Sequence, residues 1–109
     1  MPQPLDIHNL FKHTANQEDG EQIDKLMQTP HFKVERIISQ GHTTPEGQWY
    51  DQSTNEYVLL LQGSATLVIE NEPPLHLNAG DYLIIPAHTK HRVTHTQNQP
   101  ATIWLCIHY

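Results

Sequence analysis

The sequence predicts an all-β protein, built as a closed barrel or as two packed sheets. Apolar, β-rich runs of about four to eight residues recur from residue 21 to the end of the chain, and turn residues separate them. No repeat or low-complexity segment interrupts this pattern. Many short strands with regular turns are typical of β-barrels and jelly rolls. The length of 109 residues predicts one domain with a core of its own.

The first thirty residues are the least regular part of the chain. Ile7, Leu10 and Phe11 form a short apolar patch that fits either one turn of helix or a strand laid on the barrel. Residues 21–28 have apolar side chains at a helical spacing, but the segment is short and lies between an Asp-Gly pair and a Thr-Pro pair. We therefore predict a strand over residues 21–28.

Clearer strand patterns follow. Residues 32–39 alternate between two faces at their start, which predicts a strand. Residues 41–48 contain a proline and two glycines and predict a loop. Residues 56–62 and 65–70 are β-rich runs joined by a Gly-Ser turn, and we predict that they form a hairpin.

The run that begins at Glu56 carries a charged side chain on an apolar face. Glu56, Val58 and Leu60 alternate along the predicted strand, so they share one face. If that face is interior, the carboxylate of Glu56 lies inside the barrel, where an unpaired charge costs several kcal/mol. We therefore expect a partner that compensates the charge of Glu56.

The remaining strands lie in the second half of the chain. Pro86 ends one apolar run, and a new run begins at His91 after a polar turn. If Val93 packs inward, His91 and His95 point inward with it, because side chains two apart share a face. The last run is apolar on both faces, which suits a strand buried on both sides. The predicted strands of this half are Leu75–Leu77, Tyr82–Ile85, a strand starting at His91, and Thr102–Tyr109.

Composition excludes several classes of function. The chain has 12 acidic and 6 basic side chains, a formal charge of −6 and no Lys/Arg cluster, which disfavours nucleic-acid binding. No signal peptide or run of about 18 apolar residues is present, so we expect a cytoplasmic protein without a membrane span. Cys106, the single cysteine, cannot close an internal disulfide and is expected to be a small buried hydrophobe.

The strand pair around Pro86 contains a recognisable spacing. Gly80 is followed by five residues and Pro86, and His88 is followed by two residues and His91. This spacing resembles the second conserved motif of the cupin superfamily, in which an asparagine is usual at the position of His95.

A second match lies upstream, in the right order. Glu56, six further residues and Gly63 resemble the back half of the first cupin motif. The resemblance implies a cupin-type β-barrel, which is a jelly-roll-like double-stranded β-helix, over residues 31–109. Residues 1–30 are then a short N-terminal extension packed on the barrel. The resemblance also implies strands before the first motif.

The resemblance bears directly on a metal site. Metal-binding cupins typically take two ligands from a His-x-His pair, then a glutamate, then the histidine of the second motif, and Glu56 and His91 match the last two. The His-x-His pair is missing. Depending on the spacing before Glu56, its two positions are Trp49 and Asp51, or Tyr50 and Gln52.

Trp49 cannot bind a metal and Gln52 is a weak ligand, so we expect Asp51 as the third ligand beside Glu56 and His91. One imidazole and two carboxylates can hold Zn, Mn, Fe(II) or Ni, with waters completing the coordination. The expected cofactor is therefore a divalent metal ion. The set is weaker and less selective than three histidines.

Two residues are expected to do acid–base work. Four strand residues span about 13 Å, so His91 and His95 cannot both bind one ion unless a bulge shortens the path. His95 is therefore expected behind the ligands or in a pocket wall, where it moves a proton. Glu56 is the second catalytic candidate, either as ligand or as base.

A pocket is expected around the metal ligands. Trp49 and Tyr50 would supply aromatic walls, with Gln52 and His88 at the mouth. Each of these residues also has an ordinary structural explanation. Aromatic side chains pack in cores and rims, His88 can simply be solvated, and Asp51 can cap a turn.

Three functions remain open from the sequence. The chain is a metal-dependent enzyme acting on a small molecule by hydrolytic, isomerase or oxygenase chemistry, a non-catalytic module that binds or senses a small metabolite, or an inert partner protein. Carboxylate ligands favour hydrolysis or isomerisation over redox chemistry. The resemblance and the apolar last strand imply a homodimer. Fold alone does not name a substrate.

Overall fold

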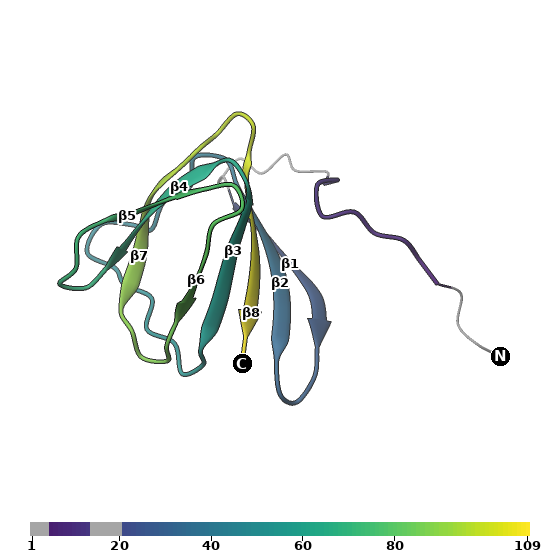
Figure 1. Ribbon diagram of the computed structural model, residues 1–109, viewed down its shortest axis with the longest axis horizontal. Helices are drawn as coiled ribbons and strands as arrows, with labels where there is room; N and C mark the ends of the chain where they lie inside the picture. Colours follow the sequence, from purple (N-terminus) through teal and green to yellow (C-terminus); the bar gives the residue numbers. More distant parts are fainter. Residues whose placement is uncertain (1–4, 14–20) are drawn as a thin grey trace.

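Eight antiparallel strands form two sheets that face each other in a computed structural model describing residues 5–13 and 21–109 (Figure 1). The described residues contain no helix, and so none that could cross a membrane. Every predicted strand is confirmed, including the strand over residues 21–28. The strands are β1 (Glu21–Gln28), β2 (Lys33–Ser39), β3 (Glu56–Gln62), β4 (Ser64–Ile69), β5 (Leu75–Asn78), β6 (Tyr82–Ile85), β7 (His91–Thr96) and β8 (Thr102–His108).

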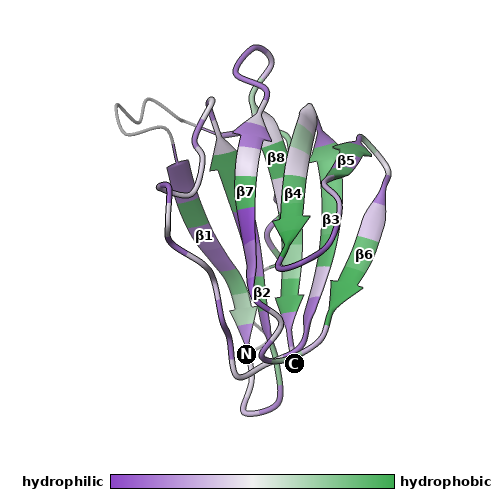
Figure 2. Ribbon diagram, turned by 90° about the vertical axis from the view of Figure 1, so that its left-hand side faces the viewer, coloured by the Kyte–Doolittle hydropathy of each residue, from purple (hydrophilic) through white to green (hydrophobic). Residues whose placement is uncertain are grey.

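The chain moves repeatedly from one sheet to the other. The five-stranded sheet has the order β1-β2-β8-β3-β6, and the three-stranded sheet has the order β5-β4-β7 (Figure 2). Strands β3 and β4 follow each other in sequence but belong to different sheets. The predicted hairpin over residues 56–70 is therefore wrong, because β3 pairs with β8 and β6 while β4 pairs with β5 and β7.

Gly63 is the point where the chain crosses between the sheets after β3. Its φ of 88° lies in the left-handed region, and an added Cβ would lie 2.7 Å from Thr102 Oγ1. The side-chain amide of Gln62 donates from Nε2 to Ala101 O at 2.8 Å, and the Thr102 hydroxyl donates to Ser64 O at 3.2 Å. These hydrogen bonds hold the connection between β3 and β4 against the start of β8. Gly63 fits a hairpin turn by its local sequence, but in the structure it is part of a connection between the two sheets.

The hydrophobic core lies between the sheets. The alternating face of β3 is interior as predicted, with Val58 and Leu60 at 3% and 0% exposure. Cys106 on β8 is buried beside them and free, which confirms its interpretation as a small buried hydrophobe. The other buried members of this cluster are Ala65, Leu67, Leu77, Ile85 and Trp104.

A bulge in β7 changes the direction of one predicted site residue. His95 pairs with Thr66, and the adjacent Leu67 pairs with Val93, so β7 has one extra residue at this point. The bulge breaks the alternation. His91 is buried, whereas His95 is exposed. Contrary to the expectation from a regular strand, His95 does not share the inward face of His91 and Val93.

The N-terminal segment has two differently placed parts. Strand β1 pairs with β2 along its length, so these residues belong to the five-stranded sheet. Residues 5–13 run as an arm away from the sheets (Figure 1), with one turn at Leu10 and Phe11 and neither helix nor strand. The guanidinium of Arg36 donates to the carbonyl oxygens of Asn9, Leu10 and Lys12 and ties the arm to β2.

Candidate functional site

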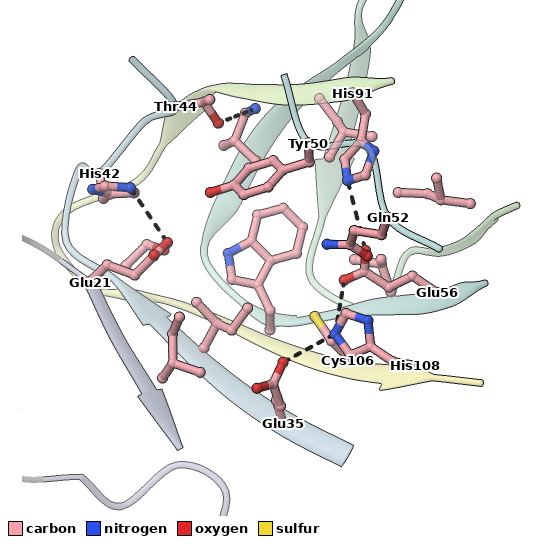
Figure 3. A pocket seen from close by; sticks show the side chains of 18 residues that line it. Glu21, Glu35, His42, Thr44, Tyr50, Gln52, Glu56, His91, Cys106 and His108 are labelled. Atoms are coloured by element: carbon pink, nitrogen blue, oxygen red, sulfur yellow. Dashed lines mark hydrogen bonds and ion pairs between the residues drawn. The ribbon is translucent and has the colours of Figure 1, made fainter. Parts of the chain in front are cut away.

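The two sheets enclose a cavity of about 160 Å³ (Figure 3). Every strand except β5 contributes side chains to its wall. Apolar side chains such as Val58, Leu67 and Trp104 form one part of the lining. Histidine and glutamate side chains form another part. An apolar enclosure with a few polar groups is typical of a small-molecule site.

The loop before β3 enters this cavity because it pairs briefly with β7. Tyr50 N donates to His91 O at 2.8 Å, and His91 N donates to Tyr50 O at 3.1 Å. Directly opposed residues of an antiparallel pair point to the same side. Tyr50 and His91 therefore both face the cavity, with ring centroids 5.5 Å apart. Gln52 lies two residues after Tyr50 in the chain and faces the cavity as well.

The same alternation turns Trp49 and Asp51 outward. Neither lines the cavity. Asp51 Oδ1 lies 3.2 Å from His88 Nδ1, and both side chains are exposed. The guanidinium of Arg92 lies 5.8 Å from the ring centroid of Trp49. The structure thus does not bring Asp51 to Glu56 and His91, and of the four predicted pocket residues it places Tyr50 and Gln52 in the wall but not Trp49 or His88.

Glu56 lies at the centre of the polar wall and is 7% exposed. His91 Nε2 is 3.7 Å from Glu56 Oε1, and His108 Nε2 is 3.8 Å from Glu56 Oε2 (Figure 3). His91 Nδ1 donates to Thr89 O at 2.8 Å, because a carbonyl can only accept. In the neutral ring, Nε2 therefore presents its lone pair toward Glu56 and the cavity.

His108 and Glu35 extend this wall and were missed as site residues. His108 Nε2 lies 3.1 Å from Glu35 Oε1, so carboxylates and imidazoles alternate from Glu35 through His108 and Glu56 to His91. The sequence did carry a signal for Glu35, which alternates with Ile37 on the inward face of β2. His108 alternates in the same way with Cys106 on β8.

A separate carboxylate–imidazole pair lies at the other end of the cavity. Glu21 Oε2 is 3.6 Å from His42 Nε2 (Figure 3). Burial raises the pKa of Glu21, and the nearby His42 partly counters this effect. Burial and then the charge of Glu21 raise the pKa of Tyr50, so its phenol keeps its proton and can donate a hydrogen bond.

The donors around Glu56 fit a divalent cation, although not the predicted set. Gln52 Oε1 is buried without a hydrogen-bond partner, while His91 Nε2 and the Glu56 carboxylate face the same space. No group of three or more His, Cys, Asp or Glu side chains is arranged for a metal within residues 5–13 and 21–109. One imidazole, one carboxylate and one amide oxygen nevertheless offer the nitrogen and oxygen donors that Mn, Fe(II), Ni or Zn accept.

The fold and the cavity define a small cupin. The Cupin domain family matches residues 36–108, and the chain belongs to this family. No curated protein matches the chain.

Similar solved structures cover nearly the whole chain. A protein of Ralstonia eutropha JMP134, named as a candidate mannose-6-phosphate isomerase, is 36% identical with a TM-score of 0.89, over 95% of this chain and 97% of that chain. A cupin superfamily protein of Desulfitobacterium hafniense DCB-2 is 19% identical, with a TM-score of 0.74 over 99% and 93%. KdgF from Halomonas sp. is 19% identical, with a TM-score of 0.69 over 86% and 84%. The last two similarities concern the fold alone.

Proposed function

We propose that the chain is a metal-dependent isomerase that moves a proton between neighbouring carbon atoms of a small carbonyl compound bound in the cavity. The observation that supports this most directly is the row of carboxylates and imidazoles in the cavity wall, in which His108 Nε2 lies 3.1 Å from Glu35 Oε1 and 3.8 Å from Glu56 Oε2. Groups that exchange protons in an enclosed site are what such chemistry needs. The Ralstonia protein, which carries an isomerase name at 36% identity, supports the same reaction class.

The proposed ligands of the divalent ion are His91, Glu56 and Gln52. The hydrogen bond from His91 Nδ1 to Thr89 O orients the ring so that Nε2 faces the cavity. The unpartnered, buried Gln52 Oε1 gains a partner if it binds a cation. When bound, a divalent ion polarises a carbonyl oxygen and makes the neighbouring C–H more acidic.

Glu35 is the proposed general base. Its carboxylate is not among the proposed metal ligands, and its side chain is 15% exposed. The imidazole of His108 lies 3.1 Å from Oε1 and holds this carboxylate in place. Glu35 removes the proton from the hydroxyl-bearing carbon beside the carbonyl and returns it to the former carbonyl carbon. The proton of that hydroxyl group moves to the former carbonyl oxygen, so the substrate keeps its composition. The exposed His95 has no part in this proposal.

Solvent-deuterium exchange tests the proposed reaction. Metal-loaded protein is incubated in D₂O with aldoses and ketoses of three to six carbons and with their phosphates, and the products are followed by proton NMR. We expect interconversion of aldose and ketose with loss of the C–H signal beside the carbonyl. Glu35→Gln should slow this by at least about 100-fold, whereas His95→Gln should not. Equal rates in the two variants, or no exchange with any compound, would contradict the proposal.

A non-catalytic small-molecule binding module is the second candidate. It is favoured by the donor set, because one amide, one carboxylate and one imidazole make a weaker metal site than the usual three histidines and glutamate. Protein that takes up no divalent metal on titration, yet binds a compound in the cavity without turning it over, would support this alternative.

Association and location complete the proposal. We place the chain in the cytoplasm as a homodimer. The free, buried Cys106 is compatible with a reducing compartment. On the edge strand β6, Tyr82 and Ile84 are 61% and 53% exposed, and apolar side chains exposed at this level are frequent at subunit interfaces. Light scattering during size exclusion measures the mass, and a single-chain mass would contradict the dimer.

A further inference from the structure

The cavity wall is rich in carboxylate side chains. Three carboxylates, those of Glu21, Glu35 and Glu56, line it. None of the chain's six lysine and arginine residues does. The three imidazoles in the wall, those of His42, His91 and His108, already lie 3.1–3.8 Å from these carboxylates. A divalent ion on Glu56 would still leave the carboxylates of Glu21 and Glu35 facing an anion that enters the cavity, and repulsion between partly buried charges is screened less than at the surface.

The two arginines of the chain are engaged elsewhere. Arg36 Nη2 lies 2.6 Å from Asp24 Oδ2 on the neighbouring strand. Arg92 lies over Trp49 and donates to Thr44 O at 3.4 Å. Neither guanidinium can reach an anion in the cavity without leaving these partners.

Lys33 is a cationic side chain next to the cavity. It lines an outer groove beside the cavity, and this groove shares Glu35, Gln52 and His108 with the cavity wall. Lys33 Nζ lies 3.5 Å from Glu35 Oε2. A phosphate in the groove would therefore approach Lys33 only beside the carboxylate that already pairs with it.

Uncharged groups of a ligand would find good partners in the same cavity. Tyr50, Gln52 and Thr44 supply uncharged hydrogen-bonding side chains, and the three carboxylates accept hydrogen bonds from hydroxyl groups. The apolar wall, which includes Trp104, suits the C–H face of a polyol. The lining thus matches a compound that is rich in hydroxyl groups and carries no negative charge.

We infer that the cavity selects an uncharged polyhydroxylated carbonyl compound, such as an unphosphorylated sugar, and excludes its phosphate ester, with Glu21 and Glu35 as the residues that impose the exclusion. The carbonyl part rests on the proposed function, whereas the exclusion of phosphate rests on the wall charge alone. The inference separates this chain from the substrate class named for the Ralstonia protein.

Binding measured without turnover tests the inference. Titration calorimetry compares aldoses and ketoses of three to six carbons with their phosphate esters, on metal-free and metal-loaded protein. We expect the best unphosphorylated compound to bind at least about tenfold more tightly than its own phosphate. Glu21→Gln combined with Glu35→Gln should reduce this ratio toward one. Glu46→Gln, which removes a carboxylate from an exposed loop, should leave the ratio unchanged.

Two other outcomes overturn the inference. A phosphate ester that binds as tightly as its parent compound contradicts the exclusion, and loss of that binding in Lys33→Ala would locate the phosphate in the outer groove. Binding of neither class contradicts the ligand assignment. Binding with the expected ratio but without deuterium exchange keeps the inference and overturns only the proposed isomerase, so the two failures are distinguishable.

Discussion

Gln52 is the residue whose role depends most on a single backbone contact. The paired hydrogen bonds between Tyr50 and His91 set which side chains of the loop face inward. A shift by one residue would turn Asp51 toward Glu56 and Gln52 toward solvent. This bridge therefore decides whether an amide or a carboxylate faces the proposed metal site, and the proposal can be tested directly.

Replacing Gln52 should weaken metal binding, whereas replacing Asp51 should not. We expect Gln52→Ala to lower the affinity for Mn²⁺ or Zn²⁺ by about 10- to 100-fold, since it removes a buried oxygen donor. Asp51→Ala is the matched control and should change the affinity less than about twofold, because Asp51 is exposed and faces away. Titration calorimetry with each metal measures both. The reverse ranking would restore Asp51 as the ligand.

At the scale of strands, the crossings between sheets hold the barrel together. Two glycines have similar φ values but different surroundings. Comparing an alanine substitution at each one distinguishes the free-energy cost of the backbone conformation from the cost of a steric clash. Gly63 has φ 88° and a Cβ there would lie 2.9 Å from Thr102 Cα, whereas Gly47 has φ 83° and open space.

Gly63→Ala should be much more destabilising than Gly47→Ala. Both substitutions force alanine into the left-handed region, at about 1–2 kcal/mol. Only Gly63→Ala also pushes a methyl group into the backbone of β8, so we expect a total loss of about 3 kcal/mol or more in the free energy of unfolding. Urea unfolding followed by tryptophan fluorescence measures both. Equal losses would mean that the crossing at residue 63 can move.

The β1–β2 pair contains an acid-sensitive contact. Burial by itself raises the pKa of Asp24, but hydrogen bonds from Arg36 and Gln22 and the charge of Arg36 outweigh it and lower the pKa. A carboxyl group with a lowered folded pKa stabilises the fold above its unfolded pKa of about 3.9, and this contribution disappears as the pH falls through the folded pKa.

Asp24→Asn should therefore cost stability at neutral pH and much less in acid. We expect the difference in unfolding free energy between Asp24→Asn and the parent chain to be largest near pH 7 and to shrink below about pH 4. Denaturant unfolding at pH 7, 5, 4 and 3 measures it. Asp6→Asn on the exposed arm is the control and should show no such trend. A difference that grows in acid would contradict the lowered pKa.

At the scale of the whole molecule, one core joins both sheets, so the barrel should open as a unit. Cys106 is a natural reporter because it is 2% exposed and free. Burial, and then the nearby carboxylate of Glu56, raise the pKa of its thiol well above the usual range. Both effects suppress the thiolate that reacts with disulfide reagents.

The thiol of Cys106 should stay unreactive until the barrel unfolds. We expect its labelling by Ellman's reagent at pH 8 to follow the unfolded fraction across a urea titration. Thr94→Cys in a Cys106→Ala background puts a thiol on the exposed part of β7 and should react at once in the native state. Fast labelling of native Cys106 would indicate local opening beside the cavity.

Most of the strands and the inward carboxylate could be predicted from the sequence, because alternation is local. Side chains two apart share a face wherever a strand is regular, so Glu56 followed from Val58 and Leu60. The same rule could have found Glu35 and His108. The spacing of glycines and proline that resembles the cupin motifs could be recognised in the sequence for a similar reason, because turns need those residues at fixed positions.

Tertiary contacts determined the features that the alternation of side chains along a strand cannot predict. The sheet that each strand joins depends on hydrogen bonds to distant strands, so Gly63 became a crossing instead of a hairpin turn. The bulge that exposes His95 follows from pairing with β4. The inward turn of Gln52 follows from the bridge at His91. The sequence by itself determined strands, turns and a buried acid; only the packed sheets decided which side chains meet around it, because partners distant in the chain have no local signature.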